Sequence, residues 1–140
     1  MTRLMHCKFA LIAPALLAAC ASQPPERLSE VARATVDKDG VQHATIVGGS
    51  YWFRPQRVIA RVNQPLELAV SKQPGFIPHS FVIDAPQAGI KVHLALGSEP
   101  RSVRFVPTRP GRYTYYCDES GLGESHRDKG MVGVLEVTPQ

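Results

Sequence analysis

The chain has 140 residues, 44% of them apolar and 20% charged, which is enough for one globular domain with appendages. Its formal net charge is +4, and without residues 1–19 it keeps 14 basic and 12 acidic side chains. A balance this weak and this evenly scattered does not favour a nucleic-acid partner.

The first 20 residues are typical of a secretory signal. Arg3 and Lys8 form a basic start, and an apolar run follows over residues 9–19. Eleven apolar residues are too few to span a bilayer as a helix, so the run is interpreted as a signal segment and not as a membrane anchor.

The apolar run ends in the sequence LAAC, which resembles the bacterial lipobox, where the cysteine is acylated and becomes the mature N-terminus. The resemblance implies a lipoprotein signal peptide over residues 1–19 and a lipid on Cys20, with several acyl chains holding the protein at the membrane. Ala21 after the cysteine implies the outer membrane. A secreted protein with an ordinary cleavage site, or an uncleaved apolar helix, is the alternative.

A polar stretch with a Pro pair follows the lipobox, and we interpret residues 20–40 as the lipidated N-terminus and a linker. A short helix over residues 26–34 is an alternative with a thin apolar face. From Val41 onwards, short apolar runs alternate with Gly and Pro and show no sustained helical period. We therefore place one domain over residues 41–140.

The apolar runs of this domain predict strands of a β-sandwich, about seven to eight in number, since turn signals recur every ~8–12 residues. The predicted strands cover 42–49, 57–63, 66–72, 79–84, 101–108, 109–117 and 132–138, with a bend at Pro55 and a weak strand or turn over 92–96. The inward-facing sets are Val58/Val62, Leu66/Leu68/Val70, Phe81/Ile83, Val103/Phe105, Tyr113/Tyr115 and Val134/Val137.

Three soft donors lie together between the last two predicted strands. Once the leader is removed and Cys20 is acylated, Cys117 is the only unmodified cysteine and Met131 the only methionine, with His126 between them. A thiolate, an imidazole and a thioether form a donor set that suits copper. Cys117 has no partner for an internal disulfide in an oxidising compartment, so a metal ligand is the favoured interpretation and an inert buried cysteine the alternative. The best candidate for a fourth ligand is His79.

These segments resemble the cupredoxin family, in its bacterial plastocyanin/azurin-like branch. IPHSFVI resembles the strand of the first histidine, PGRYTYYC the strand that delivers the cysteine, and HRDKGMVGVLEV the end of the ligand loop and the last strand. The resemblance covers about residues 42–140. It implies a Greek-key β-sandwich with one copper ion, bound by His79, Cys117 and His126 in a plane and by Met131 as a long axial ligand.

The loop between the cysteine and the histidine departs from this pattern. Eight residues, DESGLGES, separate Cys117 from His126, more than in small members of the family. The spacing is similar to that of the copper A domain of cytochrome oxidase subunit II, but Ser120 and Gly121 stand where that site needs a second cysteine. A dinuclear centre is therefore not expected.

The residues around the ligands leave further alternatives open. The loop carboxylates Asp118, Glu119 and Glu124 compete with Met131 for the axial position. Ser80 stands where many members of the family have Asn, so the backbone contact to the thiolate is expected and its side-chain support is altered.

The other conspicuous residues have ordinary interpretations. His43 and His93 lie in alternating segments and are interpreted as surface histidines, and Trp52 and Phe53 as packing residues. The chain shows no nucleophile–base set, no paired buried acids and no Gly-rich phosphate loop, so we do not expect an enzyme.

The sequence therefore predicts a blue copper protein, tethered to the membrane by lipid and facing the periplasm. We expect it to carry single electrons between redox protein partners, without a nucleic-acid partner. One alternative is a protein that sequesters or delivers copper without redox turnover. The other is a cupredoxin scaffold whose site is lost or remodelled and that serves as an interaction module.

Overall fold

The computed structural model describes residues 30–121 and 123–140, so the predicted signal peptide, the lipidation of Cys20 and the first part of the linker lie outside the described residues. Within the described residues, no helix has the length and apolarity that a membrane crossing needs. The strands are β1 (Val31–Arg33), β2 (Thr35–Val36), β3 (Gln42–Gly49), β4 (Trp52–Arg54), β5 (Arg57–Arg61), β6 (Leu66–Lys72), β7 (Ser80–Ala85), β8 (Ile90–Ala95), β9 (Arg101–Phe105), β10 (Gly111–Tyr116) and β11 (Val132–Thr138). A 3-10 turn over Pro86–Ala88 joins β7 to β8.

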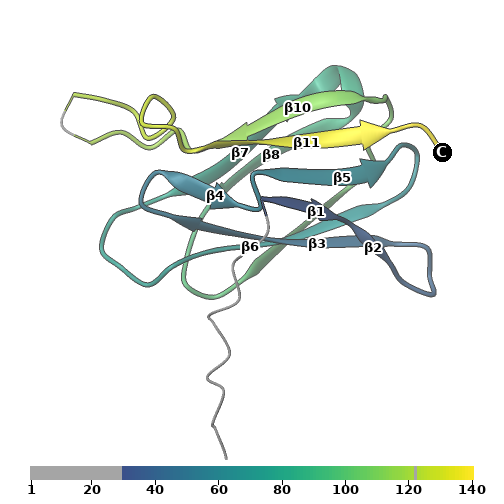
Figure 1. The fold of residues 1–140 in the computed structure, drawn as a ribbon, viewed down its shortest axis with the longest axis horizontal. Coiled ribbons are helices and arrows are strands. Elements are labelled where there is room, and N and C mark those ends of the chain that lie inside the picture. The colour runs from purple at the N-terminus through teal and green to yellow at the C-terminus, as the bar shows by residue number, and fades with distance from the viewer. Residues whose placement is uncertain (1–29, 122) are drawn as a thin grey trace, which may run out of the picture.

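The strands form two sheets that pack face to face (Figure 1). One sheet has six strands in the order β1-β5-β11-β10-β7-β8, and the other has five, in the order β2-β3-β6-β9 with β4 paired to β3. In the first sheet β10 is antiparallel to both β11 and β7, while β11 runs parallel to β5. The predicted all-β sandwich is confirmed.

The longer predicted strands agree with the structure, and the differences concern short segments. The weak segment at 92–96 belongs to a full strand, β8, in which Ile90, Val92 and Leu94 are buried and the residues between them are exposed. The additional strands β1, β2 and β4 have only two or three residues, too few to show an alternating pattern in the sequence.

The predicted linker extends too far into the chain. Residues 31–36 form β1 and β2, so the folded region begins about ten residues before the predicted boundary at Val41. The alternative helix over 26–34 is wrong for residues 31–33, because β1 pairs in parallel with β5, with Val31 opposite Arg57. A helix with a thin apolar face has little burial to gain, whereas the sheet edge offers ordered hydrogen-bond partners.

The core lies between the sheets and contains an aromatic cluster. The rings of Phe53 and Phe81 meet edge to face at 5.7 Å, and that of Tyr115 lies 5.5 Å from Phe53. The Tyr115 hydroxyl donates to the carbonyl of Pro55 at 2.6 Å, and burial raises its pKa. At Gly133 a Cβ atom would lie 2.1 Å from the Tyr115 ring, so only glycine leaves room for this ring.

One predicted core pair is partly wrong. Val137 is buried, but Val134 is only half-buried, and Leu135 takes the second core position of β11. Alternate residues of a strand face opposite sides, so two residues three apart cannot both face the core.

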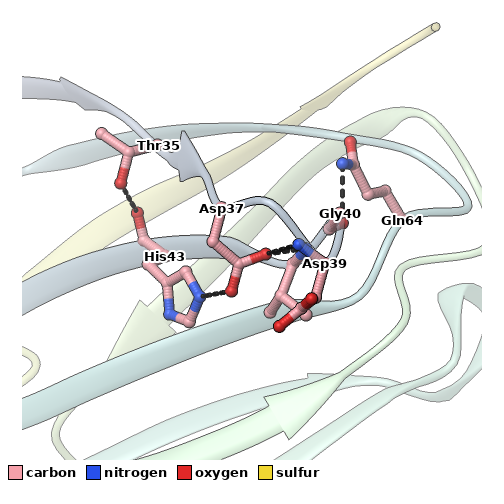
Figure 2. A network of polar contacts seen from close by, with 7 residues as sticks. Thr35, Asp37, Asp39, Gly40, His43 and Gln64 are labelled. Atoms are coloured by element: carbon pink, nitrogen blue, oxygen red, sulfur yellow. Dashed lines mark hydrogen bonds and ion pairs between the residues drawn. The ribbon is translucent and has the colours of Figure 1, made fainter.

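A polar network closes the turn from β2 to β3, at the surface of the second sheet (Figure 2). The Asp37 carboxylate accepts hydrogen bonds from the backbone of Asp39 and Val41 at 2.9 and 2.8 Å, and it pairs with His43 at 2.9 Å. The Gln64 side chain donates to the carbonyl of Gly40 at 2.8 Å. These bonds satisfy polar groups of the turn next to the buried Val41.

Candidate metal centre

The four predicted ligands gather at one end of the sandwich because β10 lies between β7 and β11. Cys117 directly follows β10, His79 directly precedes β7, and Met131 directly precedes β11. Tyr116, the last residue of β10, is paired on both sides, so these three chain positions are neighbours. His126 comes from the loop between β10 and β11, which extends beyond the end of the sandwich in Figure 1.

Three donor atoms form a compact triangle. The Nδ1 atoms of His79 and His126 lie 3.1 Å apart, and the Cys117 sulfur lies 3.9 Å from the first and 3.4 Å from the second. The corners of this triangle lie about 2.0 Å from its centre, close to a metal–imidazole bond length of about 2.0–2.1 Å. A metal ion of the size of copper or zinc therefore fits between the three atoms.

The triangle is inside the protein. The three residues are at most 5% exposed, and they are the one group of possible metal ligands found among the described residues. No described carboxylate belongs to this group. Asp118 is 43% exposed and Glu124 is exposed, so both lie toward solvent.

The long loop folds back on itself and brings its two ends together. The His126 amide donates to the carbonyl of Glu119 at 2.8 Å, and Ser120 and Ser125 form an antiparallel bridge. We call residues 119–126 the projecting hairpin. Because its base is closed by these bonds, the extra length does not separate Cys117 from His126.

The backbone of Met131 fastens the same two ligands. Its amide donates to the carbonyl of His126 at 2.9 Å, and its carbonyl accepts from the Cys117 amide at 3.1 Å. The side chain is fully buried, and it lies against Gly48, where a Cβ atom would come within 3.1 Å of the terminal methyl group. Met131 is thus held beside the ligand loop, in space that a glycine leaves free.

The imidazole of His79 is neutral at ordinary pH. Burial, together with the nearby His126 and Lys72, lowers its pKa from 6.5 to about 4. A separation of 3.1 Å between two Nδ1 atoms also requires that at least one of them carries no proton. Neutral imidazoles with free Nδ1 lone pairs are the form that binds a metal.

The Cys117 sulfur has the backbone contact that the resemblance implies. The amide of Ser80 donates to it at 3.3 Å, and the Ser80 hydroxyl lies 3.5 Å from it. This hydroxyl also accepts from the Asp118 amide at 2.9 Å. The serine therefore joins the start of β7 to the end of β10 beside the sulfur.

Sequence reasoning missed one residue of the site. The ring of Tyr51 meets that of His126 edge to face at 5.0 Å, and the Lys129 ammonium lies over the Tyr51 ring at 4.6 Å. Tyr51 has φ 66°, an uncommon conformation for a non-glycine residue. A tyrosine in the short β3–β4 connection gives no sequence signal for such a contact.

The remaining described histidines lie away from the triangle, as predicted. His43 pairs with Asp37 in the β2–β3 turn, and His93 is 68% exposed and pairs with Asp118 at 3.2 Å. Phe53 is a core residue, whereas Trp52 is half-buried with Arg54 over its ring.

No known family model matches the chain. Solved structures with a similar fold include the metal-binding domain of the Cu(I)-exporting P-type ATPase CopA of Streptococcus pneumoniae D39 with Cu(I), at 18% identity and a TM-score of 0.58, covering 80% of this chain and 99% of that one. A copper binding protein in the apo form matches at 20% identity and a TM-score of 0.54, covering 76% and 95%. Na-dithionite reduced auracyanin from Roseiflexus castenholzii matches at 17% and 0.55, covering 81% and 100%. These similarities confirm the predicted cupredoxin-like β-sandwich.

Proposed function

We propose that this protein is a mononuclear type 1 (blue) copper protein that carries single electrons between redox partners. The observation that carries the proposal is the buried triangle of two imidazole nitrogens and one cysteine sulfur. With a thioether as a weak fourth donor, this is the donor set of blue-copper electron-transfer sites. The similar structures include a domain with bound Cu(I) and a copper binding protein, which supports the choice of metal, and a dithionite-reduced auracyanin.

The chain holds its donors ready for a metal. A backbone hydrogen bond joins Met131 to His126, and the Cys117 sulfur accepts a hydrogen bond from the Ser80 amide. When bound, copper would supply a one-electron couple. Donors fixed in this way move little between the two oxidation states, which keeps reorganisation small and favours rapid electron transfer.

A second function is a protein that sequesters or delivers copper without redox turnover. The similarity to a metal-binding domain of a Cu(I)-exporting ATPase favours it. A carrier holds both oxidation states in one geometry and gives reversible voltammetry. A delivery protein instead retains Cu(I) preferentially and releases it to an acceptor.

The leader supports a place for this function in the cell envelope. We propose that Cys20 carries the lipid, and that the domain faces the periplasm and meets redox proteins there. Cys20→Ser should release the protein from the membrane fraction or leave it unprocessed, while the purified soluble domain keeps the same copper spectrum. A changed spectrum would show that the N-terminal segment contacts the site.

Addition of Cu(II) to the soluble domain, followed by visible spectroscopy, tests the metal site itself. An intense thiolate-to-copper band at one copper per chain is the expected result. Cys117→Ser should abolish the band, and a band retained in this variant would remove Cys117 from the site. Reversible voltammetry of the coloured protein then distinguishes the electron carrier from the delivery protein.

A further inference from the structure

The hydroxyl of Ser80 lies in a network that reaches from the cysteine sulfur to the protein surface. Its oxygen is 2.5 Å from a carboxylate oxygen of Asp118, 2.9 Å from the Asp118 amide and 3.5 Å from the Cys117 sulfur. The other carboxylate oxygen of Asp118 pairs with His93 at 3.2 Å. The network therefore runs from exposed His93 through Asp118 and Ser80 to the sulfur.

The Ser80 hydroxyl has one proton and two possible acceptors. Ser80 is 1% exposed, so the choice lies within the protein. The Asp118 amide donates into the hydroxyl oxygen, which leaves the O–H to be donated either to the carboxylate or to the sulfur. The carboxylate contact is short for an O–H···O hydrogen bond, and sulfur is the weaker acceptor of the two.

We propose that Asp118 is a positioning residue. Its carboxylate accepts the hydrogen bond of the Ser80 hydroxyl, so that the hydroxyl does not donate to the Cys117 sulfur. The sulfur then keeps one hydrogen bond, from the Ser80 amide, and lacks a second. This inference rests on the proposed copper site. It assigns to Asp118 and Ser80 a role in setting the reduction potential.

The direction of the effect follows from the chemistry of the thiolate. A hydrogen bond to the sulfur withdraws electron density that the sulfur otherwise donates to the oxidised metal, and hydrogen bonding around this sulfur tunes the potential of such sites. By holding the proton elsewhere, Asp118 favours Cu(II) and lowers the potential. Loss of the carboxylate frees the hydroxyl to turn to the sulfur, which raises the potential.

The charge of Asp118 has an effect of its own, because removing a negative charge near a metal also raises its potential. The two causes predict different orders among variants. Asp118→Asn removes the charge but keeps an oxygen that can still accept from Ser80, whereas Asp118→Ala removes both. Charge alone predicts equal shifts in the two variants, and the competition for the proton predicts a larger shift in Asp118→Ala.

The experiment measures the potential and the thiolate-to-copper band of wild type, Asp118→Asn and Asp118→Ala, each with Ser80 and with Ser80→Ala. His93→Gln is the matched outer variant, since it removes a partner of the same carboxylate and leaves Ser80 in place. We expect the potential to rise in the order wild type, Asp118→Asn, Asp118→Ala, with the band moving to higher energy in the same order. In the Ser80→Ala background most of the difference between the two Asp118 variants should vanish.

Equal shifts of the two Asp118 variants, or shifts that persist unchanged with Ser80→Ala, would overturn the inference and leave a charge effect. So would a band that stays in place while the potential moves. A wild-type protein with no thiolate-to-copper band would instead refute the proposed function. If Asp118→Ala fails to fold, Asp118→Asn still tests the inference, provided that it folds and keeps the thiolate-to-copper band.

Discussion

The described histidines form two pairs in regions that differ in burial and in their partners. At the metal end, His79 and His126 are 5% and 3% exposed, and their Nδ1 atoms face each other and the Cys117 sulfur. On the outer surfaces, the Nε2 atoms of the other pair lie beside carboxylates, that of His43 next to Asp37 and that of His93 next to Asp118.

The comparison shows how burial decides what an imidazole does. At His79, burial disfavours the protonated ring, so its lone pair stays free for a metal. Where a carboxylate lies within reach at the surface, the ring instead forms an ion pair or hydrogen bond of small net value. The same side chain is therefore a candidate ligand in one region and a surface contact in the other.

The largest test removes the rings one at a time. His79→Ala and His126→Ala should each weaken copper binding by more than about 100-fold, above the loss expected for an outer partner, because each removes one of three strong donors. His43→Ala is the matched control at the surface and should leave the affinity unchanged. Competition titration against a chelator of known affinity measures both. A copper site that depends on His43 would reverse the assignment of the two pairs.

The free energy of unfolding should fall in acid because of the buried His79 at the metal end. For His79 the folded pKa of about 4 lies below the unfolded value of 6.5, so the unfolded metal-free protein binds a proton that the folded one excludes. The free energy of unfolding should thus be intact above pH 6.5 and fall by about 3 kcal/mol at most as the pH drops to about 4.

Denaturant unfolding of the metal-free protein at several pH values measures this loss. The His79→Gln variant is the control, because its amide does not titrate, and it should lose less stability over the same window. Parallel curves for the two proteins would show that His79 does not contribute.

Substitutions of Met131 test whether its thioether is a fourth copper ligand beside the three donors of the triangle. Its bond to copper is expected to be long and weak, so Met131→Gln should keep the copper and the thiolate band but lower the potential, since a harder donor favours Cu(II). Met131→Leu should raise it. Voltammetry that shows no response to either change would assign Met131 to core packing, and a response to Glu124→Gln instead would assign the axial position to the projecting hairpin.

The smallest effect is expected from the surface pair of Asp37 and His43, shown in Figure 2, and it concerns the stability of the protein. Asp37→Asn should slightly destabilise the protein near neutral pH and leave the copper band unchanged, because the turn lies outside the metal site. The hydrogen bonds from His43 and from the Val41 backbone lower the Asp37 pKa, so its stabilising effect is present above about pH 4 and is lost as the pH falls further. Wild type and variant should therefore converge in acid, and a constant gap between them would contradict this role.

Much of the fold could be read from alternation in strands of five or more residues, such as β5 and β6. The three residues of the triangle were singled out in different ways, since Cys117 is the one free cysteine among the described residues, whereas His79 and His126 rest on the resemblance of the segments around them to a known family. Strands β1, β2 and β4 were not, since segments of two or three residues are fixed by pairing with distant strands. The contact of Tyr51 with His126 likewise depends on a backbone conformation that no residue pattern announces.

Because the base of the projecting hairpin is closed, the number of residues between Cys117 and His126 does not determine the distance between their donor atoms. The number of residues between Cys117 and His126 is a property of the chain, whereas the 3.4 Å between their donor atoms is set by the bonds at the base, chiefly that from His126 to Glu119. The residues beyond the Ser120–Ser125 bridge are therefore not what sets the distance between the two donor atoms.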